Sequence, residues 1–179
     1  MKESTRKLVL SGVFLTLCLI LPLLTGQIPA VGKAVSPMHI PVFLCGFICG
    51  WPYAVLVGFI APLLRSFIFH APVFYPMAVA MSFELAAYGF ISGFVYSLFR
   101  KNIAGIYITL ILAMLGGRAV YGIARFLLAA TDHNEYTFKM FLTGAFVQAV
   151  PGIIIHLILV PAVVWAVEKK ERMNQYGKK

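Results

Sequence analysis

The sequence is poor in charged residues, which make up 12% of its 179 positions, whereas 61% of the positions are hydrophobic. Soluble domains are about 45–50% apolar and about 25% charged. The mean hydropathy of +0.91 therefore excludes an ordinary soluble domain and predicts an integral membrane protein. At about 20 residues per crossing, the chain has room for six helices and little else. We expect an all-α protein with one membrane domain over residues 1–179.

Catalytic and metal-binding patterns are also missing. Aspartate occurs once, as Asp132, which excludes paired-aspartate chemistry within the membrane and aspartate-rich metal motifs. The sequence has no H-E-x-x-H, no G-x-S-x-G, no glycine-rich phosphate loop and no Walker lysine motif. These absences argue against an enzyme and predict no cofactor and no metal. Any active transport must draw its energy from another protein.

What the sequence does contain is a series of apolar runs. The first follows a basic start, but no small-residue cleavage pattern accompanies it near Gly26, so we interpret it as a retained helix and not a signal peptide. Polar or turn-forming residues separate the later runs. The predicted membrane helices span residues 8–24, 37–50, 52–69, 76–99, 103–130 and 139–167.

Lysine and arginine are concentrated on one side of this arrangement. That side holds both chain ends and the segment at Arg100, whereas the opposite loops carry only Lys33 and Lys139. The positive-inside rule then places both termini in the cytoplasm, and we expect a multi-pass protein of the plasma membrane. Topology and attraction to membrane lipid explain most of the net charge of +9, without a nucleic-acid partner.

The second and third predicted helices carry residues that usually weaken helices. Pro41 and Pro62 would loosen backbone hydrogen bonding, while Gly46, Gly50 and Gly58 would let neighbouring backbones approach closely. We interpret this stretch as tightly packed, bent helices that frame a pocket.

Three arginines and one glutamate fall inside the predicted helices: Arg65, Glu84, Arg118 and Arg125. A charge at the bilayer centre costs about 2.5–3.5 kcal/mol on insertion scales, so such side chains usually face a protein interior or a cavity. Their positions along the helices place them toward the outer half of the membrane. They are the first candidates for a substrate-binding site.

Helical spacing extends this set. Arg118, Tyr121 and Arg125 recur at intervals of three, four and seven residues and therefore share one helix face. On the preceding helix, Glu84 and Tyr88 lie four residues apart on a comparable stripe. Either face could line a pocket.

Each of these candidate site residues also has a purely structural interpretation. Arg65 and Arg125 could extend to lipid phosphates at the outer surface. Glu84 could pair with Arg118 or Arg65 as a buried structural ion pair, and the tyrosines could be ordinary membrane aromatics. The sixth helix adds one more polar group in its outer part, Gln148.

The histidines are weaker candidates. His156 lies deeper in the sixth helix, where we interpret it as a packing residue. His39 and His70 lie at outer helix ends, where an interfacial role is expected, and His133 lies in a polar loop.

Three arginines against one glutamate within the helices leave a balance of +2. A cavity with that balance would favour an anionic group such as a carboxylate, whose two oxygens match the fork of an arginine.

The chain resembles the substrate-binding S-components of energy-coupling factor (ECF) vitamin transporters. The resemblance covers essentially the whole chain, through its six-helix size, its basic cytoplasmic ends and the runs SPMHIPVFLCGFICGWPYAVLVGFIAPLLRS and AVAMSFELAAYGFISGFVY. The nearest branch is the one associated with pantothenate, pyridoxine and hydroxymethylpyrimidine, of which pantothenate is the first candidate.

The resemblance implies that the chain captures a vitamin from outside. It implies delivery by toppling in the membrane, together with a transmembrane coupling subunit and two ATPase subunits. The loop 25–36 and the segment 70–75 would form a lid, with Arg65 and His70 near the mouth of the site. The implied substrate-binding residues are Glu84, Tyr88, Arg118, Tyr121, Arg125 and Gln148.

The resemblance also implies a coupling surface on the first helix. In the family this surface carries an alanine-x-x-x-alanine pattern, because small residues permit close helix contact. The matching positions here are Gly12 and Thr16, which depart from alanine but are still small.

Two other functions stay open. A membrane enzyme acting on a lipid or isoprenoid headgroup could use Glu84 as a base and the arginines as phosphate ligands, although the acidic metal cluster expected of it is missing. In a noncatalytic scaffold, Glu84 and Arg118 would matter for folding but for no ligand.

Overall fold

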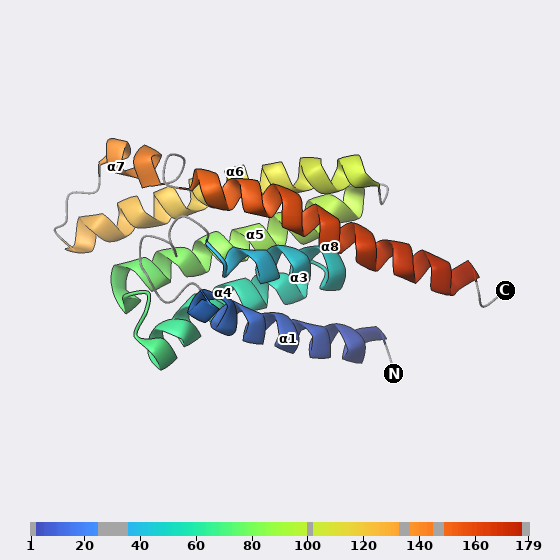
Figure 1. Ribbon diagram of the computed structural model, residues 1–179. Coiled ribbons are helices and arrows are strands. Elements are labelled where there is room, and N and C mark those ends of the chain that lie inside the picture. The colour runs from blue at the N-terminus through green and yellow to red at the C-terminus, as the bar shows by residue number, and fades with distance from the viewer. Residues whose placement is uncertain (1–2, 25–35, 100–101, 133–136, 145–148, 177–179) are drawn as a thin grey trace.

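The computed structural model describes residues 3–24, 36–99, 102–132, 137–144 and 149–176, and in these residues the chain is helical and has no strand (Figure 1). A short π-helical segment, η1, connects two of the longer helices. The elements are α1 (Glu3–Leu24), α3 (His39–Cys49), α4 (Trp51–Phe69), η1 (Phe74–Ala78), α5 (Val79–Leu98), α6 (Ile103–Asp132), α7 (Phe138–Leu142) and α8 (Val150–Tyr176).

Six full membrane crossings are not confirmed. Five helical segments of the described chain are long and apolar enough to cross a membrane, and α3 is not one of them. With 11 residues, α3 is about 16 Å long, roughly half the thickness of a hydrocarbon core. The five candidate spans are Glu3–Leu24, Trp51–Phe69, Phe74–Leu98, Ile103–Ala129 and Val150–Lys170.

The predicted sixth helix is divided. α7 ends at Leu142, and α8 begins only at Val150. Pro151 is the second residue of α8, and proline is suited to the first turn of a helix because its missing N–H needs no partner there. α8 also runs to Tyr176, beyond the predicted end at residue 167, because the glutamate and lysine residues that follow the apolar run are good helix formers.

α4 and α5 are in unusually close contact. A Cβ atom added at Gly58 would collide with the backbone carbonyl of Leu85, and one added at Gly89 would collide with that of Ala54. The two helices therefore pack backbone to backbone where they cross, as small residues permit in membrane proteins. Gly50 has a different role: its φ of +93° forms the turn from α3 to α4, a conformation that glycine adopts at little cost.

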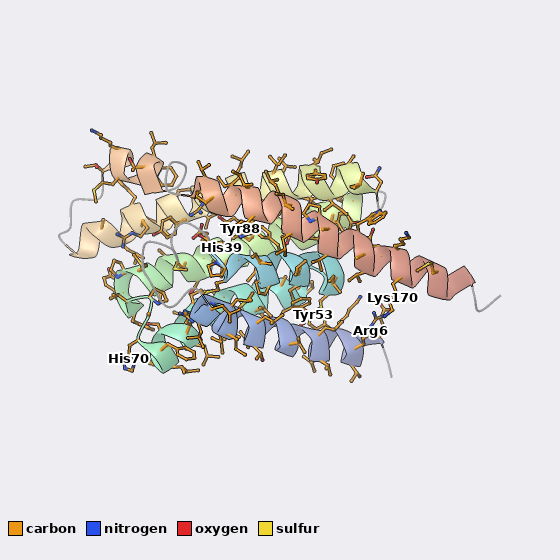
Figure 2. All side chains as sticks on the ribbon, viewed as in Figure 1. Arg6, His39, Tyr53, His70, Tyr88 and Lys170 are labelled. Atoms are coloured by element: carbon orange, nitrogen blue, oxygen red, sulfur yellow. The ribbon has the colours of Figure 1, made fainter. Side chains whose placement is uncertain are left out.

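Both ends of the described chain lie at the same end of the bundle, with Arg6 and Lys170 there and His70 at the opposite end (Figures 1 and 2). Two hydrogen bonds are made near this end. Ser4 Oγ is 3.4 Å from the hydroxyl of Tyr53, and the Tyr96 hydroxyl donates to Glu168 Oε1 at 2.6 Å. We refer to it as the terminal end.

α3 lies at the centre of the bundle, packed against α1, α4, α5 and α8. Every residue of α3 except Ile48 is buried. Because the helix is short, it begins at His39 inside the bundle and not at the surface. Figure 2 shows His39 next to Tyr88 in this interior region. The start of α3 thus brings polar groups into the middle of the protein.

Candidate functional site

Glu84 is the centre of a buried polar cluster and is only 2% exposed. Its Oε1 accepts a hydrogen bond from the Tyr88 hydroxyl at 2.8 Å, one turn along α5. The same oxygen is 3.0 Å from Nη1 of Arg118 on α6 and 3.7 Å from Nε2 of His39 on α3. A buried carboxylate is tolerated when it is paired and hydrogen-bonded, and Tyr88 and Arg118 meet that need.

The backbone fixes the orientation of the His39 ring. Nδ1 lies 3.0 Å from the carbonyl oxygen of Ser36, and because a carbonyl only accepts, Nδ1 carries a hydrogen. Nε2 then faces the Glu84 carboxylate and has no hydrogen-bond partner in the described part of the chain. In a neutral ring, Nε2 and Glu84 Oε1 are two acceptors facing each other. Glu84 Oε1 already has Tyr88 and Arg118 as donors, so Nε2 is the atom that lacks a partner, and a donor group placed beside it would supply one.

Four aromatic side chains surround this cluster in a closed circuit of contacts. The His39 ring contacts those of Tyr88 and His156, with centroids 5.2 and 5.9 Å apart. The Phe43 ring contacts the same two, at 4.8 and 5.6 Å. These separations are typical of edge-to-face and tilted aromatic pairs. We call these four residues, which come from α3, α5 and α8, the aromatic circuit.

A small cavity, about the size that one water molecule needs, lies beside the aromatic circuit. Its walls come from α3, α5, α6 and the start of α8. Nε2 of His156, a residue 4% exposed, has no hydrogen-bond partner among the described residues. The polar residues that line the cavity are Ser36, His39, Tyr88, Arg118 and His156.

The structure brings three of the predicted site residues, Glu84, Tyr88 and Arg118, into direct contact. Tyr121 and Arg125 lie one and two turns further along α6, partly buried, and do not line the cavity. Gln148 is outside the described residues, as is all of the predicted lid loop 25–36 except its last residue, Ser36.

Arg65 and His70 lie apart from the cluster. Arg65 is buried, but its Nη1 donates to the carbonyl oxygen of Leu19 at 2.9 Å, and its guanidinium is 5.3 Å from the centre of the Phe69 ring. Pro22, one turn beyond Leu19, disturbs the hydrogen bonding of α1. Arg65 therefore joins α4 to α1 near this proline. His70 is exposed at the end of α4.

The sequence pattern did not identify His39 or His156 as site residues. We expected His39 at an outer helix end and interpreted His156 as packing. The sequence predicted a short helix over 37–50, close to the observed His39–Cys49, but we placed its start at the outer surface, whereas it lies inside the bundle. The spacing of His39 and Phe43, four residues apart on one helix face, was the available signal.

Gly12 and Thr16 form a separate exposed strip on α1. A Cβ atom added at Gly12 would meet no atom within 4 Å. The Thr16 hydroxyl donates to the Gly12 carbonyl at 2.9 Å, so its polar group is satisfied within α1. The strip presents a smooth surface that another helix could approach closely.

Five apolar helices of membrane-spanning length, enclosing a buried ion pair beside a cavity, define a membrane protein with an internal polar site. The family profile described as "ECF transporter, substrate-specific component" matches residues 6–164. The chain belongs to this family. Searches of curated proteins and of solved structures found no match.

Family membership decides between the alternatives that the residues left open. Substrate-specific components of ECF transporters are transport subunits, so the chain is not an enzyme acting on lipid headgroups. Members take a small, vitamin-type substrate and work with an ECF module. The chain is thus a membrane-embedded substrate-capture subunit.

Proposed function

We propose that this chain binds a small water-soluble vitamin or vitamin precursor at the cluster around Glu84 and passes it to an ECF module for import. The observation that carries the placement of the site is the buried Glu84–Arg118 pair beside a cavity. Nε2 of His156, buried and without a described partner, also borders this cavity. A buried polar atom without a partner is costly, and a ligand would supply one.

The candidate vitamins are pantothenate, pyridoxine and hydroxymethylpyrimidine. The balance of +2 favoured pantothenate through its carboxylate, but the contacts distribute the charges differently. Arg118 is paired with Glu84, and Arg65 is bonded to Leu19 at a separate place. These contacts therefore give the cavity no excess of positive charge, and they do not favour a substrate with a carboxylate over a neutral one.

Binding requires the cavity to widen. Pockets for drug-sized ligands measure about 300–1,000 Å³, and this cavity holds about one water. Its lining residues Ser36 and Ala149 adjoin segments 25–35 and 145–148. We propose that the loop 25–36 and the segment 70–75 form the lid, and that the lid and the start of α8 move apart to admit the vitamin.

We further propose that the terminal end of the bundle faces the cytoplasm and that the chain is a plasma-membrane protein with a single membrane domain over residues 1–179. Arg6 and Lys170 lie toward the terminal end, as the positive-inside rule requires. The exposed strip of Gly12 and Thr16 would contact the transmembrane coupling subunit, which two ATPase subunits would drive.

A direct test begins with the purified full-length chain in detergent. Small molecules released by denaturing it would be identified by mass spectrometry, with an unrelated membrane protein purified in parallel as the control. The emptied protein would then be titrated calorimetrically with the three candidate vitamins. We expect one vitamin at near-stoichiometric yield and saturable rebinding. If a folded preparation released no vitamin and bound none of a broad vitamin panel, the capture function would be refuted.

A further inference from the structure

We infer that the substrate is a small heteroaromatic compound whose planar ring lies among the aromatic circuit and whose polar edge meets His39 and Arg118. An aliphatic acid such as pantothenate is the alternative. This inference rests on the proposed capture function and narrows its substrate class.

The walls of the cavity provide the first argument. Phe43, Tyr88, His39 and His156 contact one another in a closed circuit, and each of them borders the cavity. An aromatic contact adds about 0.5–1.5 kcal/mol beyond area burial. When the cavity widens, a planar heterocycle can replace the ring contacts that are lost, whereas an aliphatic chain restores only buried area.

The polar edge provides the second argument. His39 Nε2 faces Glu84 Oε1 at 3.7 Å and has no hydrogen-bond partner among the described residues, so with a neutral His39 ring it is an acceptor that calls for a donor. The guanidinium of Arg118, which offers only donors, borders the same cavity. An aminopyrimidine or a hydroxypyridine carries a donor group and a ring-nitrogen acceptor on one rigid plane. The donor group suits His39 Nε2, and the ring-nitrogen acceptor suits Arg118.

The charges provide the third argument. The Glu84 carboxylate is already the counter-charge of Arg118 at 3.0 Å. A ligand carboxylate placed against Arg118 would bring a second negative charge close to Glu84 in a buried site, where like charges repel strongly. A neutral or protonated ring avoids this repulsion.

The experiment compares ligands on the unmodified full-length chain, so that no variant has to fold. Calorimetry would measure binding of hydroxymethylpyrimidine, pyridoxine, pantothenate and a panel of other water-soluble vitamins. We expect a heteroaromatic compound to bind at least about tenfold more tightly than any non-aromatic one, the equivalent of one or two aromatic contacts. Tightest binding of pantothenate or another non-aromatic compound would overturn the inference and leave the capture function intact. No binding by any compound would overturn both.

Variants then test the ring contacts. Phe43, which is 1% exposed in the aromatic circuit, and Phe90, which is 42% exposed on the outside, allow the same substitution at a site and a control position. Phe43→Leu should weaken the heteroaromatic ligand about tenfold, and Phe90→Leu should leave it unchanged. If Phe43→Leu does not fold, His156→Gln removes a ring while keeping a polar group and should have the same effect. Unchanged affinity in a folded ring variant would overturn the inference.

Discussion

Glu84 Oε1 on α5 and Arg118 Nη1 on α6 lie 3.0 Å apart, and the Glu84 side chain is 2% exposed. The pair joins two membrane-spanning helices and lies next to the cavity at the same time. Its role in folding and its proposed role in ligand binding can be separated by experiment.

The stability role predicts a strong coupling between the two residues. Glu84→Gln and Arg118→Met should each destabilise the protein by about 3–5 kcal/mol, because each leaves an uncompensated buried charge or donor. The loss of unfolding free energy in the double variant should be clearly smaller than the sum of the losses in the two single variants. Reversible unfolding of the four proteins in mixed micelles would measure this. Additive losses would show that the two side chains do not interact in the membrane.

If Arg118 contacts the vitamin, a substitution at Arg118 should weaken vitamin binding, whereas the same substitution at Arg65 should not. Arg118→Lys keeps a charge but loses the planar fork, and it should weaken the captured vitamin by about tenfold or more. Arg65→Lys is the matched control, because Arg65 is equally within a helix but bonds to Leu19 and does not line the cavity. It should leave the affinity unchanged. Calorimetric titration of both variants measures this, and equal losses would argue against Arg118 as a ligand contact.

The exposed strip on α1 predicts a defect in transport without a defect in binding. Gly12→Leu should fold and bind the vitamin normally, because a side chain at Gly12 begins in open space. Uptake in cells that contain the ECF module should fall sharply, since bulk at this position would hold a partner helix away. Ala119→Leu, on the exposed surface of α6, controls for added bulk. Normal uptake by Gly12→Leu would place the coupling surface elsewhere.

The hydrogen bond between Tyr96 and Glu168 predicts a loss of stability only. It joins α5 to α8 near the terminal end at 2.6 Å, and both residues are buried. Tyr96→Phe should lower the unfolding free energy by about 1–3 kcal/mol, because it removes a donor from a buried carboxylate. Vitamin affinity should not change. Tyr107→Phe, at an exposed position on α6, is the control and should have no effect on either quantity.

The sequence was sufficient to predict the membrane class and the approximate place of most helices, and it offered Arg118 and Arg65 as two alternative partners of Glu84, of which the structure shows Arg118. These follow from local rules, namely apolar run length, helical spacing and the cost of an unpaired charge in the membrane. The contact between Tyr88 and Glu84 follows in the same way, since both are on one face of α5.

Other features depend on contacts between distant parts of the chain. The Arg65 side chain is buried as expected of a site residue, but its partner is the backbone of Leu19, which no side-chain pattern reveals. α3 is buried on all sides, so its apolar composition is the same as that of a lipid-facing span. Only its packing shows that it begins inside the bundle. Periodicity puts His39 and Phe43 on one helix face, but the depth of His39 in the bundle, and the contacts of these two rings with Tyr88 and His156, depend on how α3 packs.

The depth at which α3 begins limits the routes by which a solute could reach the terminal end. The cavity lies at the start of this helix, and the rest of α3, buried except at Ile48, runs from there toward the terminal end (Figure 1). Near that end, Tyr96 and Glu168 hold α5 and α8 together. A route from the cavity along α3 would require this helix to be displaced. Rotation of the entire protein within the bilayer would instead turn the cavity toward the other side of the membrane, with the interior packing left intact.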